Sequence, residues 1–277
     1  MHKVYLGRDS PVADAEHPPF FAGFSCPSEG CSIFGAVYYA EGLGNPAAVF
    51  CHGLPGLDKN GDVAQVLRCA GFNSIVFSYR GTWGSSGSFA FSGIAADVAS
   101  VVGLVRRRRL LMPERFDGRV VLIGHSTGGF AAIKAALSLP EVRDIVLLSV
   151  WNVGVDGALV RRDAATRARV EEILRSAACF YHGTTSGALF SEITRNAEAF
   201  DLRNDAAGLC GRRVLMVCGD GDASVPVEVH QKPLAETLRK AGCDVTERSI
   251  KNCDHGFSAK RNALMRTVLR WLAEGGY

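Results

Sequence analysis

The sequence predicts an α/β protein, with a mostly parallel β-sheet covered by helices on both faces. Two observations support this class. The chain has 277 residues, of which 47% are hydrophobic, so it can bury a sizeable core. Short apolar runs alternate with helix-like stretches along most of its length, which is the alternation expected of such a sheet.

Strands are expected at the short apolar runs, about eight in all. The clearest candidates are residues 47–51, 74–79, 120–124, 145–149 and 214–219. Two further runs flank this set, at 32–39 and 245–250. Helices are expected between the strands at 62–70, 93–109, 127–138 and 233–241, and an amphipathic helix at 263–272 closes the chain.

A charged segment interrupts this alternation between the sixth and seventh strands. Residues 155–208 are helical in character and lack a convincing strand. We therefore expect a core made of residues 1–154 and 209–277, with 155–208 inserted as a helical unit. The arginines within 161–175 can attract an anionic substrate, but their spacing with two glutamates also suits an exposed, salt-bridged helix, and this second interpretation is favoured.

The composition excludes several classes of function and indicates the cellular compartment. The formal net charge of +3 lacks the basic excess of a nucleic-acid binder. The nine cysteines are odd in number and scattered, and Cys26 and Cys31 have no second Cys/His pair at ligand spacing, so no metal site is expected. Residues 1–10 lack the apolar segment of a secretory signal, and no stretch is long enough to cross a membrane. These features predict a cytoplasmic protein.

The segment 120–129, VVLIGHSTGG, places a serine between an apolar strand and an alanine-rich helix. Gly124 and Gly128 lie two residues before and after Ser126, in the pattern of a nucleophile elbow. Small residues at these positions relieve crowding around a serine held on a tight turn. The helix that begins here directs free N–H groups toward an oxyanion formed at the serine. Ser126 is therefore the candidate nucleophile.

Backbone donors for that oxyanion are expected from two turns. The segment 49–56, VFCHGLPG, follows a strand, and its Leu54 carries an N–H that can join the N–H of Thr127. Pro55 has no N–H, which singles out Leu54. An ordinary Gly-Pro turn is the alternative interpretation. The glycine-dense loop 78–87, SYRGTWGSSG, does not match a dinucleotide fingerprint and is expected to shape the edge of the site.

A serine hydroxyl needs a neighbouring base with a pKa near neutrality, which histidine supplies. His255 stands in the segment 252–257, NCDHGF, just after the last expected strand. A loop there can bring the imidazole over the carboxyl end of the sheet. The other six histidines lie in the two turns above or lack this placement: His2, His17, His52, His125, His182 and His230. His255 is therefore the candidate base.

An acid that orients the base is expected after the penultimate strand, in the segment 217–226, VCGDGDASVP. Both Asp220 and Asp222 lie on this loop. Asp222 stands four residues before Pro226, whereas Asp220 is nearer the strand end, where it can cap the turn. Asp222 is favoured, and Asp220 remains the alternative.

Four motifs in this order resemble the α/β-hydrolase superfamily over essentially the whole chain: HGLPG, GHSTG, GDGDASVP and DHGF. The order Ser126, Asp222, His255 is also the order of that superfamily's catalytic triad. The resemblance implies an eight-stranded sheet with a helical cap over the active site, and 155–208 is where the cap falls. The loop 79–87 looks like that of esterases and of prolyl-oligopeptidase-like peptidases, although the propeller domain of full prolyl oligopeptidases is lacking.

Together these features predict a serine hydrolase that cleaves a small-molecule carboxylic ester through an acyl-enzyme on Ser126. Asp222 and His255 complete the expected triad, and Leu54 and Thr127 form the expected oxyanion hole. This chemistry requires no cofactor and no metal. Two alternatives remain open: a small peptidase or amidase of the same fold, and a non-catalytic ligand-binding protein.

Overall fold

The computed structural model describes residues 11–277; the segment 1–10, which bears on the expectation about a secretory signal, lies outside them. One sheet contains the eight strands β1 (Phe20–Ser28), β2 (Cys31–Tyr39), β3 (Asn45–Cys51), β4 (Asn73–Phe77), β5 (Phe116–His125), β6 (Asp144–Leu148), β7 (Arg213–Gly219) and β8 (Asp244–Ile250). Their order is β1-β2-β4-β3-β5-β6-β7-β8. The β1–β2 and β2–β4 pairs are antiparallel, and the others are parallel. The predicted α/β class is confirmed.

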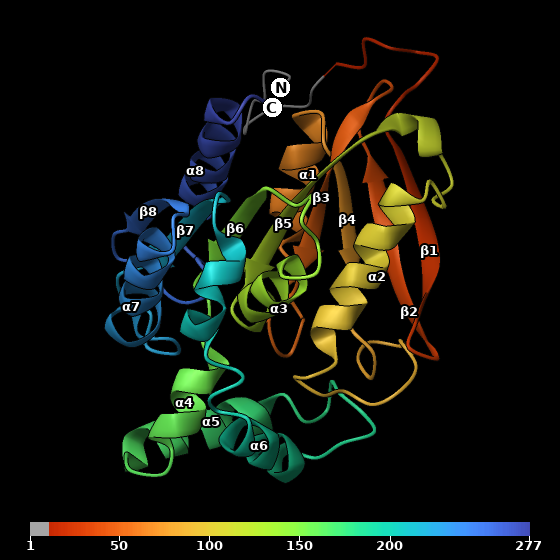
Figure 1. Cartoon of the computed structure of the whole chain (residues 1–277). Coiled ribbons are helices and arrows are strands. Elements are labelled where there is room, and N and C mark those ends of the chain that lie inside the picture. The colour runs from red at the N-terminus through yellow and green to blue at the C-terminus, as the bar shows by residue number, and fades with distance from the viewer. Residues whose placement is uncertain (1–10) are drawn as a thin grey trace.

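Helices cover both faces of the sheet (Figure 1). One face packs against α2 (Ile94–Arg106), α3 (Thr127–Ala136) and α7 (Val227–Lys240), and the other against α1 (Gly61–Cys69) and α8 (Arg261–Glu274). In β3, Val49 belongs to the first core and Phe50 to the second, because successive side chains of a strand point to opposite faces. Strands buried on both sides read as continuous apolar runs, which is why the sequence reveals them.

Three helices lie between β6 and β7 in the chain: α4 (Val153–Leu159), α5 (Ala164–Ser176) and α6 (Ser186–Arg195), followed by the short 3-10 helix η2 (Leu202–Leu209). Asp163 and Thr185 cap α5 and α6 by accepting backbone N–H groups of their first turns. Figure 1 shows α4–α6 together beyond the carboxyl ends of the parallel strands, away from α8. No helix within residues 11–277 is both long and apolar enough to cross a membrane.

Two elements differ from the sequence-based expectation. Strand β1 had no assigned range, because Gly23 and Pro27 interrupt its apolar pattern; both are tolerated at the edge of a sheet. Helix α7 begins at Val227 and not at Pro233, where the expected helix began. In the structure Pro233 lies inside the helix, so the expected range 233–241 was wrong at its beginning.

Candidate active site

Ser126 occupies the turn between strand β5 and helix α3. Its φ of 55° and ψ of −120° lie in a backbone region that residues with a side chain rarely adopt. The Ser126 N–H donates to Leu148 O at 2.9 Å. The Ser126 carbonyl accepts from the N–H groups of Gly129 and Trp151, at 3.0 and 3.1 Å. The strained serine is therefore held at the carboxyl end of the sheet, at the positive end of α3.

Gly124 and Gly128 make room for this turn. A Cβ on Gly124 would lie 2.3 Å from Gly128 O, and a Cβ on Gly128 would lie 1.9 Å from Cys51 O. Both distances are far below van der Waals contact, so neither position accepts a side chain unless the backbone moves. The two glycines therefore allow α3 to pack against the end of β3 directly beside Ser126.

The loop after β3 lies against the serine. A Cβ on Gly53 would be 3.1 Å from the Cβ of Ser126, which places the next residue, Leu54, near the proposed nucleophile. Within residues 11–277, neither the Leu54 N–H nor the Thr127 N–H donates a hydrogen bond to another protein group. Both N–H groups thus remain available for an oxyanion.

Side chains of the glycine-dense loop 78–87 hold the Leu54 loop in place. Tyr79 Oη donates to His52 O at 3.2 Å, and Trp83 Nε1 donates to Pro55 O at 2.7 Å. Both acceptors belong to the backbone next to Gly53 and Leu54. Loop 78–87 therefore supports the turn that carries Leu54.

Asp222 and His255 are in contact. His255 Nδ1 lies 2.7 Å from Asp222 Oδ2; the Asp222 side chain is fully buried and that of His255 is 23% exposed. Asp222 Oδ1 accepts the backbone N–H of Val225 at 2.8 Å. Asp220, the alternative acid, is exposed, and within residues 11–277 its carboxylate accepts only the N–H of Cys253, at 3.4 Å. The structure thus brings Asp222, and not Asp220, to His255.

The environment of Asp222 favours its ionised form. Burial by itself raises the pKa of this carboxyl, but the hydrogen bond and charge of His255 and the N–H of Val225 outweigh it, so the pKa of Asp222 lies below its usual value. An ionised Asp222 accepts a hydrogen bond from the N–H at His255 Nδ1. The other ring nitrogen, Nε2, is then free to accept a proton from a nucleophile.

His255 lies beside the serine turn. Its backbone oxygen is 2.9 Å from Nε2 of His125, the residue before Ser126, and the two imidazole rings are 4.9 Å apart between centroids. In the described part of the chain no hydrogen bond joins the Ser126 hydroxyl to the His255 ring. Bonds between a nucleophile and its base are often long until substrate binds. All the residues predicted for the site thus gather at one place, at the carboxyl end of the sheet.

A buried network beside the Asp222 loop was not predicted from the sequence. Asp156 of α4 is fully buried and accepts hydrogen bonds of 2.7 Å from Trp151 Nε1 and from Arg169 Nη2. Arg169 of α5 also donates from Nη1 to Ser224 O at 2.8 Å, two residues beyond Asp222. Arg169 therefore joins α4 and α5 to the acid loop. In the sequence it stands among other arginines, and no pattern distinguishes it.

The cysteines and acidic residues form no candidate metal centre among residues 11–277, where no group of three or more His, Cys, Asp or Glu side chains is placed to hold an ion. Cys26 and Cys31 lie on the adjacent strands β1 and β2, opposite Ile33 and Ser28 respectively, so the two thiols are not cross-strand partners. All nine cysteines are free thiols.

The sheet order, the serine turn after β5, the aspartate after β7 and the histidine after β8 together define a hydrolase of the α/β type. The model of the alpha/beta hydrolase family matches residues 48–264, which is most of the chain. The protein therefore belongs to the alpha/beta hydrolase family. No curated protein is similar enough in sequence to count as a match.

Several solved structures share the fold. Est1E from Butyrivibrio proteoclasticus has a TM-score of 0.66 at 15% identity, covering 91% of this chain and 98% of that one. A highly thermostable carboxyl esterase from Bacillus coagulans has a TM-score of 0.68 at 12% identity, with coverages of 92% and 98%. The acylaminoacyl peptidase of Pyrococcus horikoshii has a TM-score of 0.69 at 15% identity, with coverages of 92% and 41%. The predicted α/β-hydrolase fold is confirmed.

Proposed function

We propose that the protein is a serine hydrolase that cleaves a carboxylic ester through an acyl-enzyme on Ser126. The observation that carries the proposal is the 2.7 Å contact between His255 Nδ1 and Asp222 Oδ2, next to the strained Ser126 turn. A neutral imidazole oriented by a buried carboxylate is the base that a serine hydroxyl needs. A protein that only binds a ligand has no need of this arrangement, which disfavours the binding alternative.

In the proposed reaction, His255 removes the proton of Ser126 Oγ as this oxygen attacks the ester carbonyl. The N–H groups of Leu54 and Thr127 stabilise the oxyanion, and loss of one such donor typically costs about a hundredfold in kcat. His255 then passes the proton to the departing alcohol. His255 next removes a proton from water as the water attacks the acyl-enzyme, and it returns this proton to Ser126 Oγ as the acid is released. Asp222 remains ionised throughout and stabilises the imidazolium.

A peptidase or amidase of the same fold is the second candidate. The related structures include both a carboxyl esterase and an acylaminoacyl peptidase, so both activities are named on this fold. An aminopeptidase would need a carboxylate for the ammonium of its substrate, and the acidic side chains considered for this role are Glu171, Glu172, Glu192 and Glu198. Glu171 and Glu172 form ion pairs within α5, and Glu192 accepts two backbone N–H groups of residues 91–92. The engagement of these three side chains favours the ester; Glu198 is the fourth, and it is exposed.

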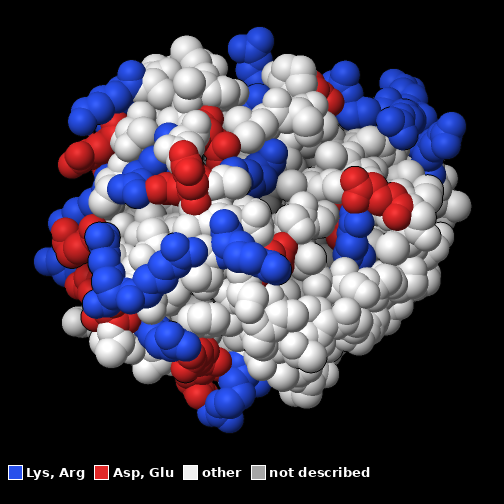
Figure 2. Space-filling model, turned by 60° about the horizontal axis from the view of Figure 1, so that its bottom comes forward, with Lys and Arg blue, Asp and Glu red and all other residues white. Residues whose placement is uncertain are grey.

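The arginines of α5 are largely paired. Arg167 lies 2.9 Å from Glu171, Arg175 pairs with Glu172, and Arg169 is turned inward. Figure 2, which brings the α4–α6 end of the molecule forward, shows acidic and basic side chains next to one another on this face. These pairs support the interpretation of α5 as a salt-bridged helix, and not as a site that attracts an anionic substrate.

We also infer that α4–α6 form a cap over the site; these helices begin at Val153, two residues before the expected cap range 155–208. Arg169 joins this segment to the acid loop, and a β-bridge between Thr82 and Tyr181 joins it to the loop 78–87. The nine free thiols support the inferred cytoplasmic location.

The test of the proposed function is hydrolysis of p-nitrophenyl esters of increasing chain length by the native protein and by Ser126→Ala, at neutral pH. We expect the native protein to release p-nitrophenolate and the variant to lose this activity, while the chain-length optimum sizes the acyl pocket. Activity that survives in Ser126→Ala would refute the assigned nucleophile. Inactivity of the native protein on every ester would favour the peptidase or the binding alternative.

A further inference from the structure

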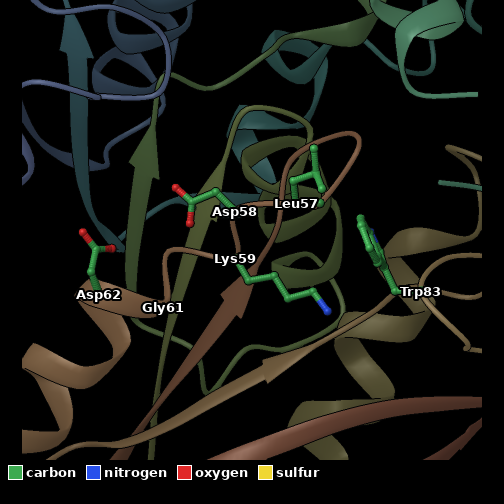
Figure 3. A pocket seen from close by; sticks show the side chains of 7 residues that line it. Leu57, Asp58, Lys59, Gly61, Asp62 and Trp83 are labelled. Carbon is green, nitrogen blue, oxygen red and sulfur yellow. The ribbon is translucent and has the colours of Figure 1, made fainter. Parts of the chain in front are cut away.

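A pocket of about 510 Å³ opens beside the oxyanion loop. It is lined by residues 56–59, by Gly61 and Asp62 at the start of α1, and by Trp83 (Figure 3). Gly56 is three residues beyond Gly53, which borders Ser126, so the Cα atoms of the two glycines are at most about 11 Å apart. The pocket therefore begins within about 11 Å of the residue that borders Ser126, a span that an acyl chain of several carbons can cover.

Two apolar side chains form a wall of the pocket. Leu57 is 66% exposed and Trp83 is 39% exposed, although both are large and hydrophobic. The Trp83 indole is fixed by its hydrogen bond to Pro55 O and by stacking on Phe180, with the ring centroids 4.9 Å apart. A rigid aromatic surface left open to solvent in a pocket is typical of ligand binding.

Lys59 brings a positive charge to this pocket. Its Nζ donates to Ser78 Oγ at 2.6 Å, which is the only hydrogen bond that the ammonium makes among residues 11–277. An ammonium has three donors, so two remain available. In the same part of the chain no carboxylate lies within ion-pair distance of Lys59. Burial accordingly lowers the pKa of Lys59, as expected for a half-buried charge without a counter-ion.

The two carboxylates that line the same pocket share one cation, Arg261. Asp62 accepts from Arg261 Nε at 2.7 Å, and Asp58 lies 3.7 Å from Nη1 of the same guanidinium. Figure 3 shows both carboxylates on one side of the pocket, whereas the Lys59 side chain extends the other way, toward Trp83. The end of the pocket at Lys59 and Trp83 therefore combines an aromatic wall with a positive charge that has no carboxylate partner among residues 11–277 and lies 5.9 Å from the centroid of the Trp83 ring.

We propose that this pocket binds a carboxylate attached to an apolar group, and that the substrate ester carries such a carboxylate. The second part rests on the proposed function. The carboxylate oxygens accept the two remaining Nζ donors of Lys59, and the apolar part of the ligand packs on Trp83 and Leu57. A singly charged group is favoured over a dianion such as a phosphate monoester, because Asp58 and Asp62 line the same pocket and repel a second negative charge.

The kinetic test compares the p-nitrophenyl monoester of suberic acid with methyl p-nitrophenyl suberate, a neutral ester of the same length. We expect the native protein to have the lower KM for the anionic ester. Lys59→Met should raise the ratio of the two KM values, anionic over neutral, by at least about tenfold, because the substitution removes both charge-assisted hydrogen bonds to the carboxylate. Lys59→Arg should keep most of the preference. Lys232→Met removes an exposed lysine paired with Glu228 on α7 and is the matched control. A ratio in Lys59→Met equal to the native ratio overturns the proposal.

A direct binding measurement tests the pocket independently of the proposed reaction. Calorimetry on Ser126→Ala compares 3-phenylpropanoate with 3-phenylpropanamide, which has the same shape and no charge. We expect the carboxylate to bind about tenfold more tightly and the added substitution Lys59→Met to abolish the difference. This result supports carboxylate binding in the pocket even if the native protein cleaves no ester. In that case the proposed ester hydrolysis is wrong and the proposed binding site is not. Equal affinities for 3-phenylpropanoate and 3-phenylpropanamide would refute carboxylate binding in the pocket, and they would leave the proposed ester hydrolysis unaffected. Thermal unfolding verifies beforehand that each variant folds.

Discussion

Arg169 of helix α5 donates a hydrogen bond of 2.8 Å to the backbone oxygen of Ser224, in the loop that carries Asp222. The same guanidinium lies 2.7 Å from the buried carboxylate of Asp156, which is itself 3.4 Å from Nε2 of His230 on α7. One side chain thus connects the α4–α6 segment with the loop of the proposed acid. Arginine suits this position because its planar guanidinium offers several donors in a fixed geometry.

Removing this connection should destabilise the protein. Arg169→Met leaves the carboxylate of Asp156 buried without its cation, so we expect the free energy of unfolding to fall by about 3 kcal/mol. Denaturant unfolding measures the change. Arg167→Met, on the same helix, removes an exposed pair with Glu171 and should cost under about 0.5 kcal/mol. Equal losses in the two variants would show that the buried contact adds no stability.

Asp222→Asn should lower kcat/KM for ester hydrolysis by about 10⁴-fold, the size of effect known for removal of the acid from a serine-protease triad. The amide cannot stabilise the imidazolium of His255 and favours the wrong tautomer. Steady-state kinetics on a p-nitrophenyl ester measure the loss. Asp220→Asn alters an exposed carboxylate on the same loop and is the matched control. A loss of the same size in Asp220→Asn would transfer the role to Asp220.

The stability of the protein should decrease in mild acid. Burial lowers the pKa values of three histidines: His52 to about 4, His125 to about 3 and His230 to about 4. In the unfolded chain these rings bind protons near pH 6.5. Below about pH 6.5 the unfolded state therefore binds more protons than the folded state, and the free energy of unfolding falls as the pH decreases toward about 4.

Urea unfolding above and below this pH range measures the effect, with up to three protons taken up on unfolding. The slope of the free energy of unfolding against pH counts the protons taken up on unfolding. In His230→Gln this slope should correspond to one proton fewer, whatever the effect of the substitution on stability itself. A slope identical to that of the native protein would mean that His230 does not remain neutral in the fold.

Gly128→Ala should destabilise the serine turn, because the added Cβ meets Cys51 O at 1.9 Å. We expect a loss of about 2 kcal/mol in the free energy of unfolding and a lower rate of ester hydrolysis, since α3 must shift together with Ser126. Gly187→Ala is the matched control: its Cβ on α6 meets no atom within 4 Å. It should gain up to about 1 kcal/mol from helix propensity. Thermal unfolding and ester kinetics distinguish the two variants.

Most of the fold could be predicted from the sequence. The central strands are buried on both faces and therefore form continuous apolar runs, and Gly124 and Gly128 mark the turn at Ser126 because only glycine fits there. Strand β1 was not located because an edge strand needs no such run, and Pro27 is permitted there. The beginning of α7 was misplaced because the packing of the helix overrides the local preference of Pro233.

The sequence by itself determined the class of the fold and the candidate nucleophile and base, since these depend on apolar periodicity and on the steric demands of single turns. Only the tertiary structure decided which aspartate contacts His255, that Arg169 is turned inward while its neighbour Arg167 is exposed, and that Lys59 faces a pocket without a counter-ion. Each of these outcomes depends on the burial of a charge and on its distance to groups far away in the chain. Local sequence patterns do not encode such distances.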